Sequence, residues 1–253
     1  MNPNDKPDQS FDSIANKFQR NIYGTSKGQL RHQLLLEYLQ PYLTQKPLSI
    51  LDAGGGSGQM TQALLELGHN VHLLDVSEDM LVIAQQQCHQ FADFSVEQNS
   101  IQQHQPQQQY DMVLCHAVLE WLQDPMPVIK LMTEWLKPQG HLSLSFFNRD
   151  AQLFGNALYG NFDYIDKDLK VGNRVRLNPN NALVPQQVLA CLAELPLEVQ
   201  HQAGIRCIHD YVRDKSLQQS HYQQILELER RFGKQHPYMW LGKYFHIIAQ
   251  RFN

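Results

Sequence analysis

A short apolar segment that runs directly into a glycine-rich turn constrains this chain more than any other feature of its sequence. The segment "SILDA" is followed by "GGGSG", which places glycine at Gly54, Gly55, Gly56 and Gly58. Glycine loses more backbone entropy on folding than other residues, so such a run indicates a close approach of the backbone to a ligand. A glycine-rich turn between a strand and a helix presents backbone N–H groups to that ligand. The turn therefore predicts a nucleotide-type site at the end of the first strand.

Segments with strand and helix patterns alternate around this turn. Helical patterns are expected at 59–68, 78–91 and 124–140. Strands are expected at 47–56, 70–77, 93–100 and 141–148, and a further strand is expected at the start of the segment 110–121. Apolar segments of this length that alternate with helices predict parallel βαβ units and a doubly wound α/β sheet.

The two flanks of this core have a different organisation. Apolar positions recur at helical spacing from Phe11 to about Leu43, and "NIYGTSKGQ" divides them into two helices. This pattern predicts an N-terminal helical segment within residues 1–45, of which residues 1–10 are expected to be disordered, before a domain at 46–253. After the fifth strand the polar, asparagine-rich residues 151–182 predict an insertion that caps the sheet. A helix at 185–195, a helical stretch around 220–233 and two final strands within 197–212 and 243–252 complete the expected elements.

Composition excludes several classes of protein. The N-terminus is polar and no apolar run reaches the roughly 18 residues that span a bilayer, so we expect neither a signal peptide nor a membrane segment. The four cysteines are far apart and indicate reduced thiols in a cytoplasmic protein. The net charge of −4 argues against a general nucleic-acid binder but allows a local basic patch. The twelve histidines lack ligand spacing with a cysteine or an acid, so no metal site is expected.

Acidic residues at the ends of the first two strands narrow the choice of ligand. A phosphate-binding P-loop would need Lys after Gly58, and the third glycine of a dinucleotide motif falls on Gln59. Asp75 ends the second strand, where an acid can accept hydrogen bonds from ribose hydroxyls. Asp52 can either hold a cationic amine or brace the loop. This set suits a nucleoside that carries an amino group and no pyrophosphate.

The segment "ILDAGGGSG" followed by "HLLDVS" resembles the class I S-adenosylmethionine-dependent methyltransferases. That resemblance implies a Rossmann-like fold with a seven-stranded, mostly parallel sheet and S-adenosylmethionine as cofactor. Four further segments, "FDSIANKFQRNIYGTSKGQLR", "HAVLEWL", "GNFDYI" and "GIRCIHDY", resemble one bacterial family. Its members methylate the carboxyl group of 5-carboxymethoxyuridine at the tRNA wobble position. The resemblance therefore implies the anticodon loop of tRNA as the partner.

The resemblance also implies which residues contact the cofactor. Arg31 would reach its carboxylate, Asp75 its ribose, and the residues after the third strand its adenine. The full set of implied cofactor contacts is Arg31, Gly54, Gly55, Asp75, Asn99, Ser100 and His116.

The chemistry of methyl ester formation predicts a further group of residues. A carboxylate is ionised at neutral pH, so it needs orientation and a cationic clamp rather than a general base. Arg206 is the best candidate for this clamp, because it stands in an apolar run beside His209 and Tyr211. Trp121 is a candidate base-stacking residue, and Glu120 could accept hydrogen bonds or merely begin a helix. The other candidate cations and aromatic platforms are Lys27, Arg174, Arg176, Arg213, Tyr23, Tyr159, Phe162 and Tyr164.

Three other functions fit parts of the pattern. A methyltransferase of a small carboxylic acid or other metabolite is favoured by the acidic net charge, because a tRNA partner prefers a positive surface. A non-catalytic S-adenosylmethionine sensor would bind the cofactor without turnover. A nicotinamide oxidoreductase is disfavoured by the glycine spacing.

Overall fold

A central sheet of seven strands organises the computed structural model, which describes residues 25–44, 47–170 and 181–252. The strand order is β3-β2-β1-β4-β5-β7-β6, and β7 is the one antiparallel strand of this sheet. The strands are β1 (Ser49–Ala53), β2 (Asn70–Asp75), β3 (Phe94–Gln98), β4 (Tyr110–His116), β5 (Leu136–Phe147), β6 (Leu197–Ile205) and β7 (Tyr244–Arg251). The expected doubly wound, mostly parallel sheet is confirmed.

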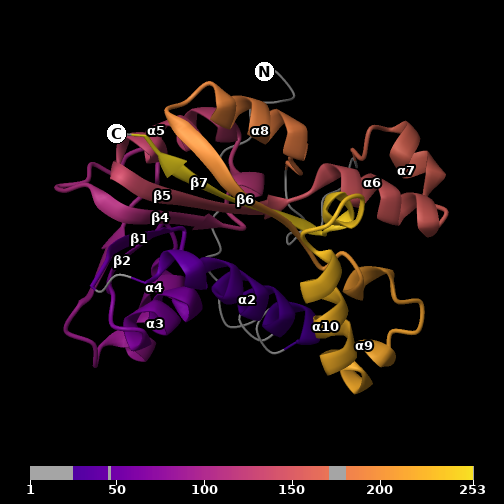
Figure 1. The fold of residues 1–253 in the computed structure, drawn as a ribbon, viewed down its shortest axis with the longest axis horizontal. Coiled ribbons are helices and arrows are strands. Elements are labelled where there is room, and N and C mark those ends of the chain that lie inside the picture. Colours follow the sequence, from indigo (N-terminus) through magenta and orange to yellow (C-terminus); the bar gives the residue numbers. More distant parts are fainter. Residues whose placement is uncertain (1–24, 45–46, 171–180, 253) are drawn as a thin grey trace.

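Helices cover both faces of the sheet and form three layers with it (Figure 1). The helices on one face are α5 (Pro125–Glu134) and α8 (Pro185–Ala193). The helices on the other face are α2 (Ser26–Leu39), α3 (Gln59–Glu66), α4 (Glu78–Cys88) and α10 (Tyr222–Phe232). The shorter elements are η1 (Gln40–Tyr42), η2 (Leu119–Trp121), α6 (Arg149–Leu158), α7 (Phe162–Asp166), η3 (His209–Tyr211), α9 (Leu217–Ser220) and η4 (Tyr238–Leu241).

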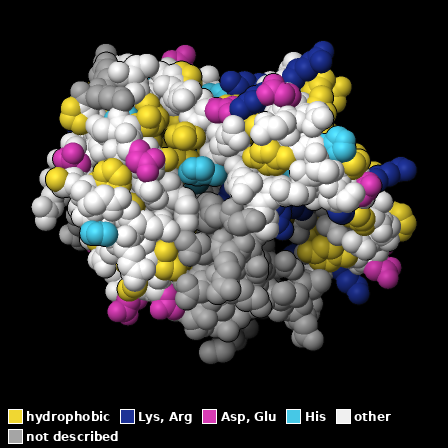
Figure 2. All heavy atoms as spheres, turned by 90° about the horizontal axis from the view of Figure 1, so that it is seen from below, with side chains coloured by type: hydrophobic (Ala, Val, Ile, Leu, Met, Phe, Trp, Pro, Cys, Tyr) yellow, Lys and Arg dark blue, Asp and Glu magenta, His cyan; other side chains and the backbone are white. Residues whose placement is uncertain are grey.

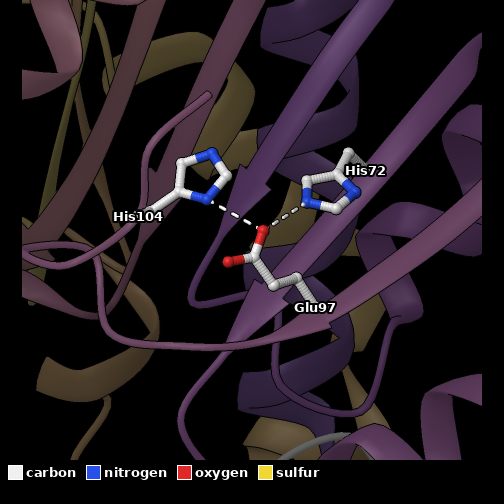
Figure 3. Close-up of side chains that lie close together, drawn as sticks. All are labelled: His72, Glu97 and His104. Carbon is white, nitrogen blue, oxygen red and sulfur yellow. Dashed lines mark hydrogen bonds and ion pairs between the residues drawn. The ribbon is translucent and has the colours of Figure 1, made fainter. Parts of the chain in front are cut away.

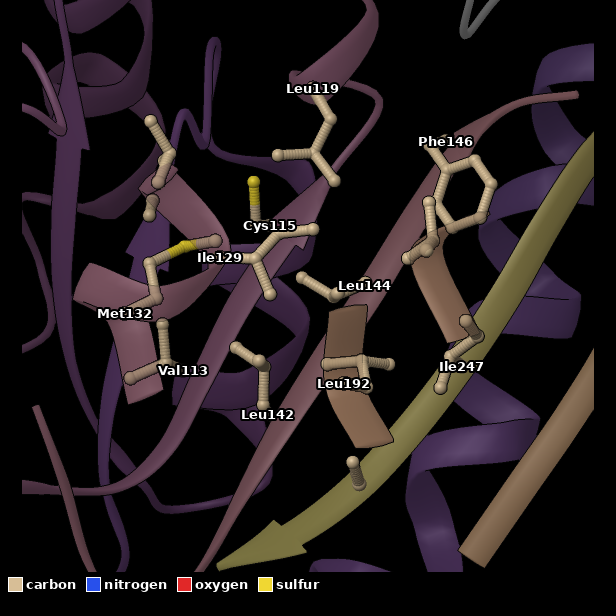
Figure 4. Close-up of a cluster of buried hydrophobic side chains, with 14 of the residues drawn as sticks. Val113, Cys115, Leu119, Ile129, Met132, Leu142, Leu144, Phe146, Leu192 and Ile247 are labelled. Carbon is tan, nitrogen blue, oxygen red and sulfur yellow. The ribbon is translucent and has the colours of Figure 1, made fainter. Parts of the chain in front are cut away.

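The central strands are apolar on both sides because both of their faces are buried. In β4, Val113 and Cys115 point toward α5, where they pack with Ile129 in the cluster drawn in Figure 4. Met112 and Leu114 point to the opposite face and join the cluster that contains α2. The N-terminal segment therefore shares a core with the sheet.

Two sequence-based boundaries are wrong. The helix expected to run through residue 140 ends at Glu134, and β5 already begins at Leu136. Pro138 has no N–H for a helix, Gln139 has a φ of +64°, and Leu136 pairs with Tyr110 of β4. The strand expected within 197–212 ends at Ile205, where the chain turns out of the sheet.

The predicted cap insertion contains two helices, α6 and α7, which lie to the side of the sheet (Figure 1). Residues 171–180 and the first expected N-terminal helix lie outside the described residues. Within the part of the chain that is described, no helix has both the length and the apolar character needed to cross a membrane.

The buried side chain of Asn148 attaches this insertion to the core. Its amide nitrogen donates to the carbonyl oxygens of Trp240 (2.8 Å) and Gly242 (2.9 Å). Its oxygen accepts from the backbone N–H groups of Asp150 (3.0 Å) and Ala151 (3.4 Å), which caps α6. One carboxamide thus fixes the start of α6 to the segment before β7.

Candidate functional site

The sequence-predicted cofactor residues gather at one edge of the sheet. Gly54 follows β1, Asp75 ends β2, Asn99 follows β3 and His116 ends β4. These are the carboxyl ends of parallel strands, the edge at which open α/β sheets bind ligands.

The glycine turn is required by close packing and by backbone conformation. A Cβ atom at Gly54 would lie 2.4 Å from Val118 Cγ2, and one at Gly55 would lie 2.8 Å from the carboxylate carbon of Asp52. Gly56 has a φ of +57°, and a Cβ atom there would meet nothing within 4 Å. The turn is therefore fixed on its inner side and open beside Gly56.

Asp75 holds the open side of this turn. Its Oδ2 accepts the N–H of Gly56 at 2.9 Å, and its Oδ1 accepts the N–H of Ser77 at 2.9 Å. The backbone oxygen of Asp75 also accepts the N–H of Asn99 at 3.1 Å. A carboxylate has about four lone-pair sites and can accept several hydrogen bonds at once.

Asp52, by contrast, has the bracing role. Its Oδ2 accepts the hydroxyl of Thr61 in α3 at 2.7 Å, and the side chain is buried. Burial raises the pKa of Asp52 to about 6, and the nearby Asp75 acts in the same direction. This hydrogen bond ties the first strand to the helix that follows the turn.

Asn99 and Ser100 form the next part of the edge. Ser100 donates its backbone N–H to Asn99 Oδ1 at 2.9 Å, and Asn99 Nδ2 donates to Glu97 Oε1 at 2.9 Å. Both residues are partly exposed beside Asp75. This position suits the adenine contact that the resemblance implies.

His116 presents one ring nitrogen that lacks a partner. Its Nε2 shares a hydrogen bond with Ser143 Oγ at 2.8 Å, whereas Nδ1 is buried without a hydrogen-bond partner. Burial, together with Arg31 and His32, lowers the pKa of His116 to about 3. The ring is therefore neutral at physiological pH.

Two predicted arginines meet at a tyrosine that sequence reasoning missed. The guanidinium carbon of Arg31 lies 4.9 Å from the ring centre of Tyr244, and that of Arg206 lies 5.7 Å from it. Because β7 is antiparallel, its first residue lies at the same edge as the last residues of the parallel strands. The signal for Tyr244 was a final strand that begins with polar and aromatic residues.

Arg206 is already held by an acid. Its Nε donates to Asp210 Oδ1 at 2.8 Å and its Nη2 donates to Asp210 Oδ2 at 2.5 Å. Burial alone would raise the pKa of Asp210, but Arg206 and His209 hold it well below its usual range. Arg206 therefore has a fixed guanidinium, of which Nη1 is not used by the pair.

Glu229 of α10 holds the loop that carries Arg206, a role that the sequence analysis did not predict. This fully buried carboxylate on α10 accepts the backbone N–H groups of Cys207 (2.9 Å), Ile208 (3.0 Å) and His209 (2.9 Å). His209 in turn contacts Ser26 Oγ at the start of α2 through Nε2 at 3.2 Å. The loop is thus bonded to both neighbouring helices.

Trp121 and Glu120 follow β4 in the buried turn η2. Trp121 is 9 % exposed and donates its indole N–H to Ala117 O at 3.1 Å, which fits a wall of the site better than an open stacking platform. Both carboxylate oxygens of Glu120 are buried without a hydrogen-bond partner. Burial raises the pKa of Glu120 to about 7, against an opposing effect of Arg31.

Replacing Glu120 is expected to change how stability depends on pH. The pKa of a free glutamate is about 4.3, whereas that of Glu120 in the folded protein is about 7. The folded state therefore loses stability relative to the unfolded state as the pH rises between these two values. Glu120→Gln should therefore unfold at higher denaturant concentration than the wild type at pH 8, by on the order of 2 kcal/mol, with a smaller difference at pH 5. Urea titrations at both pH values measure this, and a difference independent of pH would contradict it.

The remaining candidates divide into three groups. Tyr159 and Phe162 are 64 % and 63 % exposed on the insertion. Tyr164 is partly buried there, and Lys27 and Arg213 are exposed. Tyr23, Arg174 and Arg176 lie outside the described residues.

Comparisons with known proteins agree with this arrangement. A family model described as "Methyltransferase domain" matches residues 51–142. The tRNA 5-carboxymethoxyuridine methyltransferase of Escherichia coli (strain K12) is 38% identical over 96% of this chain and 97% of its own length. A ubiquinone biosynthesis O-methyltransferase of Cronobacter sakazakii is 28% identical over 62% of this chain and 64% of its own.

Solved structures share the fold. The magnesium protoporphyrin IX methyltransferase of Synechocystis PCC 6803 has a TM-score of 0.64 at 16% identity, covering 95% of both chains. The plantazolicin methyltransferase BpumL has a TM-score of 0.60 at 16% identity, covering 95% of this chain and 90% of its own. The chain thus belongs to the class I S-adenosylmethionine-dependent methyltransferases and, among them, to the family of the tRNA 5-carboxymethoxyuridine methyltransferases.

Proposed function

We propose that this enzyme transfers the methyl group of S-adenosylmethionine to the carboxylate of 5-carboxymethoxyuridine at the wobble position of tRNA, which forms the methyl ester. The observation that carries the proposal is a pair of guanidinium groups at the Tyr244 ring in a chain that matches the E. coli enzyme over nearly its whole length. One guanidinium is available for each of two carboxylates, that of the cofactor and that of the substrate. Because tRNA is the acceptor, we place the reaction in the cytoplasm.

The residues at the sheet edge fit the cofactor. The turn is open beside Gly56, the Asp75 carboxylate at the end of β2 is an acceptor suited to ribose hydroxyls, and Nδ1 of His116 is a buried polar atom without a hydrogen-bond partner. Arg31 would hold the cofactor carboxylate, and Asn99 with Ser100 would contact the adenine. When bound, S-adenosylmethionine supplies an electrophilic methyl group on a positively charged sulfur.

The protein's contribution to the reaction is orientation. A substrate carboxylate has a reference pKa of about 4 and is already a nucleophile at neutral pH, so no residue has to remove a proton. Because Nε and Nη2 of Arg206 are bound by Asp210, Nη1 can make a single contact with the substrate carboxylate. That contact orients one oxygen and leaves the other free to attack in line with the S–CH₃ bond.

Two lysines lie near Arg206. Lys243 is coupled electrostatically to Arg206 and Lys27, and burial is the main cause of its lowered pKa. Figure 2 shows Lys and Arg side chains, interspersed with Asp and Glu, on the side of the molecule where α9 and α10 lie. An anionic substrate is favoured there in spite of the acidic net charge of the chain.

Exposed aromatic side chains on the insertion suit an unpaired base. Tyr159 directly follows α6 and Phe162 begins α7, both are exposed, and Lys215 Nζ lies 5.9 Å from the ring centre of Tyr159. Anticodon bases are recognised by stacking on such rings, with cations placed for the phosphates. We assign this surface to the anticodon loop.

Arg206→Ala is expected to slow tRNA methylation while leaving cofactor binding intact. Loss of one charged hydrogen bond to the substrate should lower kcat/KM by about tenfold to thirtyfold. The dissociation constant of S-adenosylmethionine, measured by calorimetry, should change by less than about twofold. Lys130→Ala, which removes an exposed cation from α5 on the other face of the sheet, is the control. Equal losses of activity and of cofactor affinity would give Arg206 a structural role instead.

The function itself is tested with tRNA from a strain that lacks the final ester. The protein is incubated with this tRNA and S-adenosylmethionine, and the tRNA is digested and examined by mass spectrometry. We expect 5-carboxymethoxyuridine to gain one methyl group. Cofactor binding without conversion would overturn the proposal in favour of a small carboxylic acid substrate, and cofactor binding without turnover of any acid would favour a sensor.

A further inference from the structure

Two histidines and a glutamate meet at the β3 edge of the sheet, outside the site described above. His72 lies on β2, Glu97 on β3, and His104 in the segment between β3 and β4. The parallel register pairs His72 with Ser95 and Leu74 with Glu97, which places both side chains on one face of the sheet. Figure 3 shows both imidazole rings directed at the same carboxylate oxygen.

The distances between these side chains match those between ligands of a bound ion. His72 Nε2 lies 3.3 Å and His104 Nδ1 lies 2.9 Å from Glu97 Oε2, and all three ligand atoms lie within 4.8 Å of one another. A tetrahedral ion with bonds of about 2.0–2.1 Å separates neighbouring ligand atoms by about 3.3 Å.

His104 lacks other partners for its polar atoms. The residue is 5 % exposed and its ring packs edge-on against Trp135, with ring centres 5.1 Å apart. Nε2 has no hydrogen-bond partner, and the contact of Nδ1 is the one with Glu97 Oε2 at 2.9 Å. A buried imidazole nitrogen that faces a carboxylate oxygen needs positive charge between the two atoms, and a bound ion would supply that charge.

A second set of hydrogen bonds orients two of these ligands. His72 Nδ1 contacts Ser95 Oγ at 2.8 Å, which leaves Nε2 directed at the cluster. Glu97 Oε1 accepts from Asn99 Nδ2 at 2.9 Å, which leaves Oε2 for the cluster. Metal-binding histidines and carboxylates are commonly held by such outer partners. The Glu97 side chain is 35% exposed, so an ion can reach it from solvent.

We propose that His72, Glu97 and His104 bind one divalent transition-metal ion, best Zn²⁺, through Nε2, Oε2 and Nδ1, with water as the fourth ligand. Two imidazoles and one carboxylate favour Zn²⁺ or its neighbours over Mg²⁺ and Ca²⁺, which prefer oxygen ligands. The sequence-based expectation of no metal site rests on local spacing, whereas these ligands come from two strands and a loop. The ion would join β2 and β3 to the segment that begins with Asn99.

Titration of the chelator-treated full-length protein tests this proposal. We expect one equivalent of Zn²⁺ to bind by calorimetry, and one equivalent of Co²⁺ to give the visible absorption of a tetrahedral site. Glu97→Gln keeps an acceptor for Asn99 but removes the charged ligand, and it should weaken Zn²⁺ binding at least tenfold. His104→Ala should do the same, and far-ultraviolet circular dichroism checks that both variants fold.

The exposed residue His89, which lies on the surface beyond α4, provides the matched control. His89→Ala should keep the wild-type zinc affinity and cobalt spectrum. Absence of saturable binding in the wild type, retention of affinity by Glu97→Gln, or loss of binding in His89→Ala would each overturn the site. None of these readouts depends on methyltransferase activity.

Discussion

Asp75→Ala is expected to weaken binding of S-adenosylmethionine by roughly a hundredfold to a thousandfold, which corresponds to about 3–4 kcal/mol. We assign the Asp75 carboxylate to two ribose hydroxyls, and a hydrogen bond to a charged group contributes about 1.5–3 kcal/mol. The substitution also removes the acceptor for the N–H groups of Gly56 and Ser77, so the open side of the turn loses its support. Isothermal calorimetry of the purified variant measures the loss directly.

Two further variants separate the ribose contact from support of the turn. Asp75→Asn retains one acceptor oxygen and should lose less affinity than Asp75→Ala. Glu78→Ala removes an exposed acid three residues away and should leave the dissociation constant within about twofold. An unchanged affinity in Asp75→Ala would show that the ribose is held elsewhere.

Glu229→Ala is expected to lower the free energy of unfolding by about 3–5 kcal/mol, because it leaves buried N–H groups without an acceptor. The carboxylate accepts the backbone of Cys207, Ile208 and His209, and the residue is fully buried. An ordinary domain has a free energy of unfolding of about 5–15 kcal/mol, so this loss would be a large fraction of the total. Denaturation in urea, followed by circular dichroism, gives the value.

The same helix supplies the control for this prediction. Glu227→Ala removes an exposed acid that pairs with Arg230, and surface ion pairs contribute at most about 1 kcal/mol. Glu229→Gln keeps one acceptor oxygen, so its free energy of unfolding should lie between those of Glu229→Ala and Glu227→Ala. A Glu229→Ala protein as stable as Glu227→Ala would mean that the Arg206 loop is held by its other contacts.

Local pattern was sufficient to predict Gly54 and Asp75 as cofactor residues, whereas Arg31, Asn99, Ser100 and His116 were predicted from the resemblance to a family. Gly54, Asp75, Asn99 and His116 each stand at the end of an expected strand, and the carboxyl ends of parallel strands share an edge. No knowledge of tertiary contacts is needed for that step.

The proposed substrate contacts, Arg206 and Tyr244, are brought together by tertiary contacts that no local sequence pattern predicts. Insertion of β7 between β5 and β6 brings Tyr244 beside Arg206, and no local pattern sets that strand order. The bond from Glu229 to the Arg206 loop joins residues about one-tenth of the chain apart and is visible only after folding. The helix boundary at Glu134 was missed for a similar reason, since pairing with β4 decides where β5 begins.

The position of β7 has a consequence for how such enzymes diversify. In our proposal the methyl donor is bound by Arg31 of α2 and by residues at the ends of β1 to β4, whereas the acceptor is bound by Arg206, which directly follows β6, beside Tyr244 at the start of β7. The two proposed roles would therefore be encoded mainly in separate stretches of sequence, which meet where β5 pairs with β7. We therefore expect substitutions in the carboxyl-terminal third of the chain to change the acceptor more readily than the donor.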